Sequence, residues 1–353
     1  MTKLYVRPLG LTYGPAAAAA VAEGAALPLA GGPTAFALAE LIEGVPGKTK
    51  TKTFTAQVLA ASGEPHLKSL LERITAKRPP FAGLDLRRTV LMGIVNVTPD
   101  SFSDGGLFDS TETAIAHAAA LAGAGAAIVD IGGESTRPGS DAVEAGEEAA
   151  RVIPVIKGVA GLPAVISIDT RKASVARVGA DAGAKILNDV SALTYDPKSV
   201  EVAAKAGMGV ILMHAQGEPK TMQDDPRYED VVLEVFDYLE GRIEAAGQAG
   251  IALSHIAADP GLGFGKTLAH NLALLSHISL FHGLGVPLLI GASRKRFIQG
   301  LSGGASPRAR EPGSQAAAIA AASQGAQILR VHDVEGTSQA LKVWRASMTG
   351  TEN

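Results

Sequence analysis

The feature that most constrains the fold of this chain is a regular alternation of apolar and helical segments after residue 85. The apolar runs have strand length, and we predict eight strands, at residues 90–97, 127–131, 164–168, 185–188, 209–213, 256–258, 287–290 and 327–331. The intervening segments include predicted helices at residues 111–123, 144–157, 172–182, 230–249 and 315–324. Eight strands alternating with helices over about 260 residues indicate an α/β fold, the (β/α)8 TIM barrel.

A doubly wound open sheet is the competing architecture. It usually has fewer strands and carries a glycine fingerprint after the first one. Here the first predicted strand runs into Asn96-Val97-Thr98-Pro99-Asp100, which favours the barrel. With 4% aromatic residues, the core must be packed mainly by Ala, Val, Ile and Leu.

Each predicted strand ends at, or is followed closely by, a polar side chain. These residues are Asn96, Asp130, Asp169, Asn188, His214, Asp259, Ser293, and Arg330 with His332. In a (β/α)8 barrel the carboxyl ends of the strands form the active site. The pattern therefore predicts a polar pocket at one mouth of the barrel.

Residues 1–85 have a different pattern. We expect strands at residues 1–13 and 51–58, helices at 34–43 and 66–77, and a polar loop or hairpin tip at 44–52. Pro79, Pro80 and Gly83 mark a linker. We predict an N-terminal extension or small accessory domain, residues 1–85, whose role the sequence leaves open, followed by a barrel of residues 86–353.

Composition excludes several classes of protein. The net charge of −3 lacks the basic footprint of a nucleic-acid-binding protein, so we expect no nucleic-acid partner. The absence of cysteine excludes disulfides and thiolate sites, and fits a cytoplasmic protein. The alanine run at residues 16–22 is too weakly apolar for a signal peptide, and no apolar stretch reaches the length of a membrane span, so we expect no membrane partner.

Two loops follow the first two predicted strands. NVTPDSFSDGG, residues 96–106, combines an amide, hydroxyls, two carboxylates and Phe102, and GGESTRPGS, residues 132–140, places hydroxyls beside Arg137, which suits an anionic oxygen. Solvated turns are the alternative for both.

Asp169, Asn188 and Asp259 end the third, fourth and sixth predicted strands. Acceptors that converge on one pocket suit a flat heterocycle with donor edges, because a carboxylate accepts two parallel N–H bonds. A hard-cation site and helix caps remain the alternatives.

The glycine-rich DPGLGFGK, residues 259–266, lacks the spacing of a P-loop. Phe264 could form a pocket wall or pack in the core, and Lys266 could reach a phosphate or a ring carbonyl. Ser293-Arg294-Lys295 and Arg330-Val331-His332 follow the seventh and eighth strands, where barrels often bind phosphate. An exposed basic face is the alternative.

The motifs together resemble those of the dihydropteroate synthase family, over roughly residues 89–344. They are MGIVNVTPDSFSDGG, GGESTRPGS, SIDTRK, LNDVSAL, DPGLGFGK, GASRKRF and RVHDV. The resemblance implies condensation of (7,8-dihydropterin-6-yl)methyl diphosphate with p-aminobenzoate, giving 7,8-dihydropteroate and diphosphate in folate biosynthesis. It also implies a homodimer. The extension, residues 1–85, is a departure from the compact form of the family.

The resemblance implies a role for each matching residue. Asp169, Asn188 and Asp259 would bind the pterin edges, and Lys295 its ring, in a slot shaped by Met213 and Phe264. Asn96 would ligate Mg²⁺ carried by the diphosphate, whose oxygens would be held by Thr136, Arg330 and His332. The p-aminobenzoate site would be lined by Phe102, Pro138 and Ser293, with Arg137 and Asp104 on closing loops.

The catalytic residues expected on this basis are Asp104, Arg137, Lys295 and Arg330. A pterin-dependent methyltransferase and a non-catalytic pterin-binding paralogue are the alternatives. Retention of Thr136-Arg137, Arg330 and His332 argues against the first alternative. The presence of Lys295, Arg330 and the loop after the first strand argues against the second.

Overall fold

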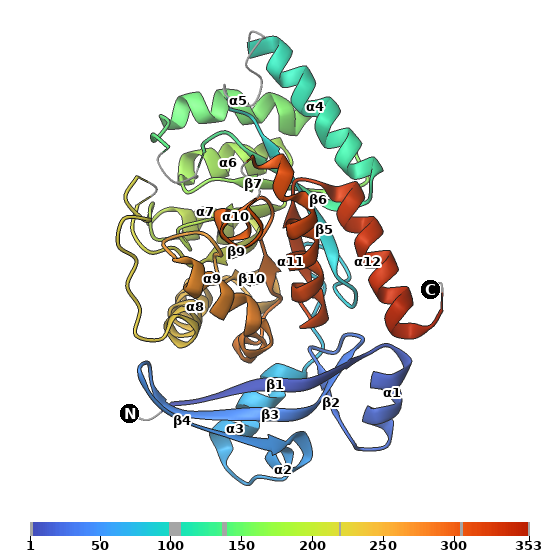
Figure 1. Ribbon diagram of the computed structural model, residues 1–353. Coiled ribbons are helices and arrows are strands. Elements are labelled where there is room, and N and C mark those ends of the chain that lie inside the picture. Colours follow the sequence, from blue (N-terminus) through green and yellow to red (C-terminus); the bar gives the residue numbers. More distant parts are fainter. Residues whose placement is uncertain (1–2, 99–106, 136–139, 219, 304–305, 352–353) are drawn as a thin grey trace.

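The computed structural model describes residues 3–98, 107–135, 140–218, 220–303 and 306–351. It confirms the predicted barrel: parallel strands pair in the order β10-β9-β8-β7-β6-β5-β12-β11 (Figure 1). A parallel bridge between Ala258 of β10 and Leu288, next to β11, joins the two ends of this order and closes the barrel. Its strands are β5 Val90–Asn96, β6 Ala126–Gly132, β7 Val165–Asp169, β8 Ile186–Asp189, β9 Gly209–Met213, β10 Ile256–Asp259, β11 Leu289–Ile290 and β12 Ile328–Val331.

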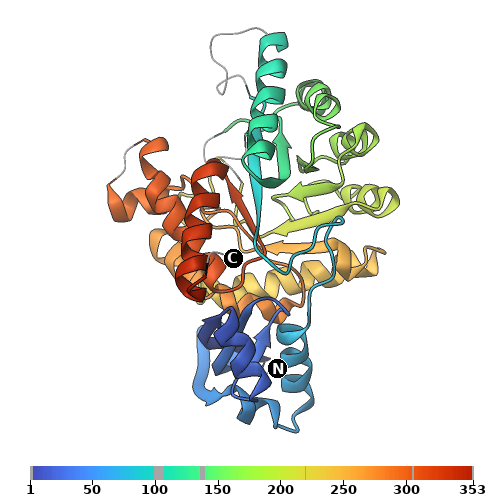
Figure 2. The same ribbon diagram turned by 90° about the vertical axis from the view of Figure 1, so that its right-hand side faces the viewer.

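Helices cover the outside of these strands (Figures 1 and 2). They are α4 Leu107–Gly123, α5 Ala145–Gly158, α6 Ala173–Ala182, α7 Ser199–Ala206, α8 Val231–Gln248, α9 Leu268–Ser276, α10 Arg296–Ser302, α11 Glu311–Ser323 and α12 Val334–Thr349, with short 3₁₀ helices η2 Leu253–His255, η3 Ile278–Leu284 and η4 Arg308–Arg310. All five predicted helices of the barrel are confirmed, with ends shifted by up to four residues. None of the helices that the structure describes is long and apolar enough to cross a membrane.

The barrel interior is apolar at its amino-terminal end, which we call the floor. Strand side chains there form one buried cluster with Phe81 and Leu86 of the linker: Met92, Ile128, Ile186, Ile211, Ala257, Leu289 and Ile328. Phe81 is fully buried, and a Cβ on Gly209 would lie 3.0 Å from its ring. The glycine thus leaves room for the aromatic side chain that closes the floor.

Residues 3–75 form a separate antiparallel sheet with three helices, beneath the barrel in Figure 1. The central strand β3, Thr34–Val45, pairs with β1 Lys3–Tyr13 along one edge and with β2 Leu27–Leu29 and β4 Lys48–Thr55 along the other. The helices are α1 Pro15–Ala22, α2 Ala56–Ala60 and α3 Pro65–Thr75.

Three predictions for this region were wrong in whole or in part. The helix expected at residues 34–43 is strand β3, because pairing on both edges outweighs the helix propensity of its Ala, Leu and Glu residues. The loop or hairpin tip expected at residues 44–52 is confirmed only at its tip, the turn at residues 46–47 between β3 and β4. Most of that segment is strand β4, and the strand expected at 51–58 gives way to α2 at Ala56. The predicted strand at residues 1–13 and helix at 66–77 correspond to β1 and α3.

Polar contacts fix this small domain to the barrel. The Lys3 ammonium lies 2.6 Å from an Asp237 carboxylate oxygen and 2.5 Å from a Glu240 carboxylate oxygen, both on α8. The buried Arg78 guanidinium donates to backbone oxygens of Arg73 and Ala76 at the end of α3, and to His282 O in η3. One guanidinium therefore caps α3 and joins it to the barrel.

Candidate active site

The polar residues predicted at the strand ends meet inside the opposite end of the barrel, which we call the mouth. Arg330 lies between two carboxylates: its Nε is 2.6 Å from Asp130 Oδ2, and an Nη is 2.7 Å from Asp169 Oδ2. The Asn188 amide donates to the same Asp130 oxygen at 3.0 Å. Strands β6, β7, β8 and β12 thus contribute to one hydrogen-bonded group.

Asp259 and Lys295 face this group from β10 and from the loop after β11. The Gly261 N–H donates to Asp259 Oδ1 at 2.8 Å, which fixes the carboxylate. A Cβ placed on Gly291 would lie 3.8 Å from Arg330 Cβ, 3.9 Å from Asp259 Oδ2 and 4.0 Å from Lys295 Nζ. The three side chains therefore converge beside a glycine, where no side chain fills the space between them.

Burial perturbs the charges of the mouth. It raises the pKa of Asp169 to about 8, against the opposing effect of Arg330, and it also raises the pKa of Asp259. Burial lowers the pKa of Lys295 to about 8. For Arg330, burial is outweighed by Asp130 and Asp169, so its pKa is raised. Such perturbed groups, clustered at strand ends, are typical of an active site.

Met213 and Phe264 flank these charges. Met213 ends β9 and is buried, whereas Phe264 is only partly buried, which favours the pocket wall over the core. The Lys295 ammonium lies 4.4 Å from the centre of the Phe264 ring and donates to Leu262 O. Lys266 is buried, and its Nζ contacts His214 and the Phe264 backbone.

Ser293, predicted to line the p-aminobenzoate site, and His332, predicted to bind the diphosphate, lie side by side. The Ser293 hydroxyl is 3.0 Å from His332 Nδ1. Between Ser293 and Lys295 the backbone of Arg294 adopts φ of 60°, a strained conformation, and the Arg294 side chain turns to Glu311. Arg294 N donates to Ser314, and Arg310 donates to Arg294 O, so α11 and the adjacent η4 hold this turn.

Several predicted residues lie outside the described part of the chain. These are Phe102, Asp104, Thr136, Arg137 and Pro138. The predicted metal ligand Asn96 ends β5, paired in register with Gly132 of β6. No group of three or more His, Cys, Asp or Glu side chains among the described residues could hold a metal ion. A single amide at the mouth fits a metal ion that takes most of its ligands from a bound anion.

The sequence predicted no role for a buried ionic network around Glu134. Glu134 accepts from Arg171 at 3.0 Å and from Lys172 at 2.5 Å, and Lys172 also contacts Glu148 of α5. The only signal in the sequence was the presence of charged residues inside two motifs, GGESTRPGS and SIDTRK. The two members of each ion pair are 24 to 38 residues apart in the chain, so the pairing was not predictable from the sequence.

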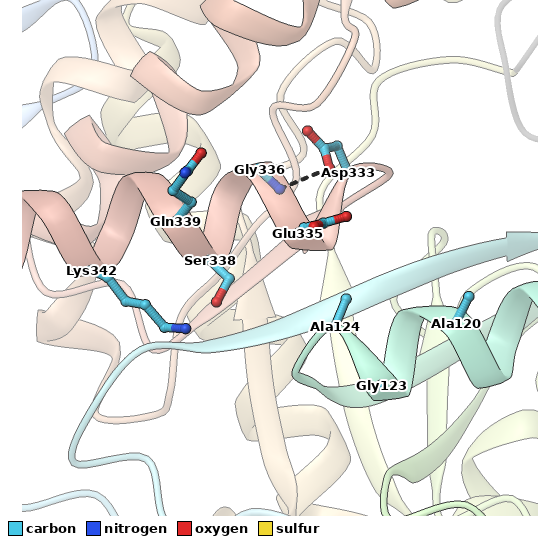
Figure 3. Close-up of a pocket in the computed structure, with 9 residues that line it drawn as sticks. All are labelled: Ala120, Gly123, Ala124, Asp333, Glu335, Gly336, Ser338, Gln339 and Lys342. Atoms are coloured by element: carbon cyan, nitrogen blue, oxygen red, sulfur yellow. Dashed lines mark hydrogen bonds between the residues drawn. The ribbon is translucent and has the colours of Figure 1, made fainter.

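A groove of about 850 Å³ lies between α4 and α12 (Figure 3). It is lined by Ala120, Gly123, Ala124, Asp333, Glu335, Gly336, Ser338, Gln339 and Lys342. Asp333 accepts the Gly336 N–H at 2.9 Å and so caps α12. Since none of the predicted site residues lines this groove, the mouth remains the candidate site.

Comparison with known proteins identifies the family of this chain. Residues 92–332 match the family model described as pterin binding enzyme. The chain is 49% identical over 271 residues to the dihydropteroate synthase of Escherichia coli K12, covering 76% of this chain and 95% of that protein. It is 52% identical over 268 residues to that of Neisseria meningitidis serogroup C, covering 75% and 94%.

Solved structures give the same result. A Xanthomonas albilineans dihydropteroate synthase with 4-aminobenzoic acid superimposes with a TM-score of 0.71 at 50% identity, covering 75% of this chain and 96% of that one. The same enzyme in complex with 7,8-dihydropteroate gives a TM-score of 0.69 at 47% identity, covering 75% and 95%. The chain therefore belongs to the pterin-binding enzyme family, and within it to the dihydropteroate synthases.

Proposed function

We propose that this chain is a transferase that condenses (7,8-dihydropterin-6-yl)methyl diphosphate with p-aminobenzoate, releasing diphosphate and forming 7,8-dihydropteroate in folate biosynthesis. The observation that carries the proposal is the convergence of Asp169, Asn188, Asp259, Lys295 and Arg330 at one mouth. The Xanthomonas albilineans relatives, solved with 4-aminobenzoic acid and with 7,8-dihydropteroate, support the substrate class.

The pterin would lie across the mouth with its donor edge on Asp259 and Asn188. Asp259 is held by Gly261 N–H, so its carboxylate is oriented before the ligand arrives. The Lys295 ammonium, stacked over Phe264, would donate to an acceptor of the ring. Met213 and Phe264 would pack on the faces of the heterocycle.

Breaking the bond between the pterin methylene and the diphosphate requires stabilisation of the leaving group. Arg330 and His332 would stabilise its developing charge, and Thr136 would join them. Mg²⁺, ligated by Asn96 and the diphosphate oxygens, would supply further charge stabilisation. Arg330 is already paired with Asp130 and Asp169, so the diphosphate would share this cation with the two carboxylates.

The second substrate would bind beside Ser293, between loops that carry Phe102, Asp104, Arg137 and Pro138. The aniline nitrogen of p-aminobenzoate is neutral at pH 7 and nucleophilic, so no strong general base is required. An electron-rich dihydropterin can delocalise positive charge on its methylene carbon, which favours an SN1-like path. Asp104 would stabilise that cation.

The test is release of diphosphate from the pterin diphosphate by the purified protein with Mg²⁺, with and without p-aminobenzoate. We expect turnover to require both substrates and the product to be 7,8-dihydropteroate. Absence of turnover in the complete mixture would refute the assigned reaction. Arg330→Ala should impair turnover far more than binding of the bare pterin, and equal losses would make Arg330 a structural residue.

We also propose that the protein is a cytoplasmic homodimer. Exposed leucines on neighbouring helices support an interface: Leu268 of α9 is 40% exposed, and Leu301 of α10 is 60% exposed. A Cβ on Gly300 would lie 3.4 Å from the Leu268 side chain, so the two helices share one surface. Analytical ultracentrifugation of Leu301→Glu against the unaltered protein tests this assignment, and an unaltered protein that sediments as a monomer would contradict it.

A further inference from the structure

The loop after β10 contains a buried cation that the reaction does not use. Lys266 is 3% exposed, and its Nζ lies 2.9 Å from His214 Nδ1, 3.3 Å from His214 O and 2.9 Å from Phe264 O. An ammonium has three N–H donors, and three protein acceptors take them. No donor is left for a phosphate or a ring carbonyl, which are the roles that the sequence suggested.

We propose that Lys266, paired with His214, is a positioning residue that holds the Phe264 wall of the pterin slot. This inference rests on the proposed function, because pterin is the ligand whose binding it would control.

The loop that carries Phe264 is built for close contact with the loop after β9. Gly261 has φ of +68°, and a Cβ there would lie 1.9 Å from His214 O. Gly265 has φ of +63°, and a Cβ there would lie 2.2 Å from Gln216 O. The backbones of the two loops therefore touch on both sides of Phe264, and Lys266 joins the same two loops through hydrogen bonds.

His214 is suited to accept this bond at every ordinary pH. Its ring packs edge-on against Tyr238, with centroids 4.9 Å apart, and it is buried. Burial, assisted by the Lys266 charge, lowers the pKa of His214 to about 2. The imidazole stays neutral, so Nδ1 remains an acceptor and the proton is on Nε2.

Aromatic side chains enclose this pair. Tyr228 and Tyr238 pack against the His214 ring, and His270 packs against Tyr228. Burial lowers the pKa of Lys266 well below its usual value. Lys266 therefore acts through its hydrogen bonds to the two loops.

The experiment measures binding of unsubstituted pterin by calorimetry for the unaltered protein, Lys266→Met, Lys266→Arg and His214→Phe. Lys205→Met is the control, because Lys205 pairs on the surface with Glu201. We expect Lys266→Met to weaken binding about tenfold, because the loop that carries Phe264 loses the hydrogen bonds that hold it.

The other variants test the hydrogen bonds separately. Lys266→Arg keeps a donor at the site and should recover part of the lost affinity, and His214→Phe removes only the imidazole acceptor and should weaken binding less than Lys266→Met. The KM for p-aminobenzoate should change less than twofold in all of them. Unchanged pterin affinity in Lys266→Met, or a loss shared equally by both substrates, would overturn the proposal.

Two further outcomes are distinguishable. If the unaltered protein does not bind pterin, the proposed function itself fails. If Lys266→Met does not fold, as judged by circular dichroism, His214→Phe decides, since unchanged pterin affinity in that variant would contradict the positioning role.

Discussion

The two ends of the barrel interior are built from the same strands but differ in almost every physical property. On β6, β8 and β12 the inward positions of the floor are isoleucines, and two residues further along each strand they become Asp130, Asn188 and Arg330. Side chains two apart on a strand face the same way, so one step along each strand changes a packed core into a charged pocket. Stability and chemistry can thus be altered separately.

The buried charges of the mouth must be paired, whereas the apolar floor has no charges to pair. Isolated buried charges are costly, and a buried carboxylate without a partner protonates or destabilises the fold. Asp130 and Asp169 share Arg330, while Asp259 faces Lys295 and Lys266. Carboxylates and cations are therefore balanced locally, and removing one member changes the state of the others.

The largest expected effect is at the floor. Phe81→Ala should lower the free energy of unfolding by about 3–5 kcal/mol, because a fully buried ring leaves a cavity beside Gly209. Urea denaturation measures this loss, and kcat/KM at a temperature where the variant is folded should stay within about twofold. Phe54→Ala, at a partly buried position on β4, is the control and should cost less. A matching fall in pterin affinity would show that the two ends are coupled.

The second-largest effect is at the mouth, where ligand affinity should change and stability should not. Asp259→Asn should weaken pterin binding about 100-fold, because an amide presents a donor where the pterin edge needs an acceptor. The unfolding free energy should not fall by more than about 1 kcal/mol, since the amide avoids the cost of a buried charge. Calorimetry and denaturation test the pair of expectations, with Asp225→Asn at the surface as control. Unchanged pterin affinity would remove Asp259 from the site.

A smaller effect follows from the lowered pKa of Lys295. Below about pH 8 the ammonium is charged and can donate to the pterin, and above it the proton is lost. Pterin affinity should therefore fall about tenfold as pH rises through 8. Lys295→Arg, which stays charged, should remove this alkaline limb in a pH titration of binding. An identical limb in the variant would assign it to Asp169, whose pKa is also about 8.

The smallest effect should come from the contact between the N-terminal domain and the barrel. Lys3→Met removes the ion pairs to Asp237 and Glu240, both of which are partly exposed. It should lower the free energy of unfolding, measured by urea denaturation, by about 1 kcal/mol. Pterin affinity should not change, because α8 meets this domain on the outside of the barrel. Lys68→Met, on the exposed side of α3, is the control. An altered affinity would connect the domain with the mouth.

The sequence predicted the barrel and the strand-end residues because both are local patterns, a run of apolar residues followed by a polar one. It failed at β3, where Ala, Leu and Glu favour a helix and only pairing with β1 and β4 makes a strand. It also missed the roles of Lys266 and Glu134. Their hydrogen-bond partners come from other strands or from distant segments, so the pairing depends on the tertiary fold. The boundary at residue 85 stays a prediction.

The position of Phe81 has a practical meaning for anyone who shortens this protein. A version that starts at residue 86 would keep all eight strands of the barrel, yet it would lack the aromatic side chain that seals the barrel beneath Gly209. A version that starts at residue 78 would retain that seal and would lose only the small sheet with its helices. The structural unit of the barrel thus begins several residues before its first strand, in a segment whose prolines and glycine made it look like a mere connection.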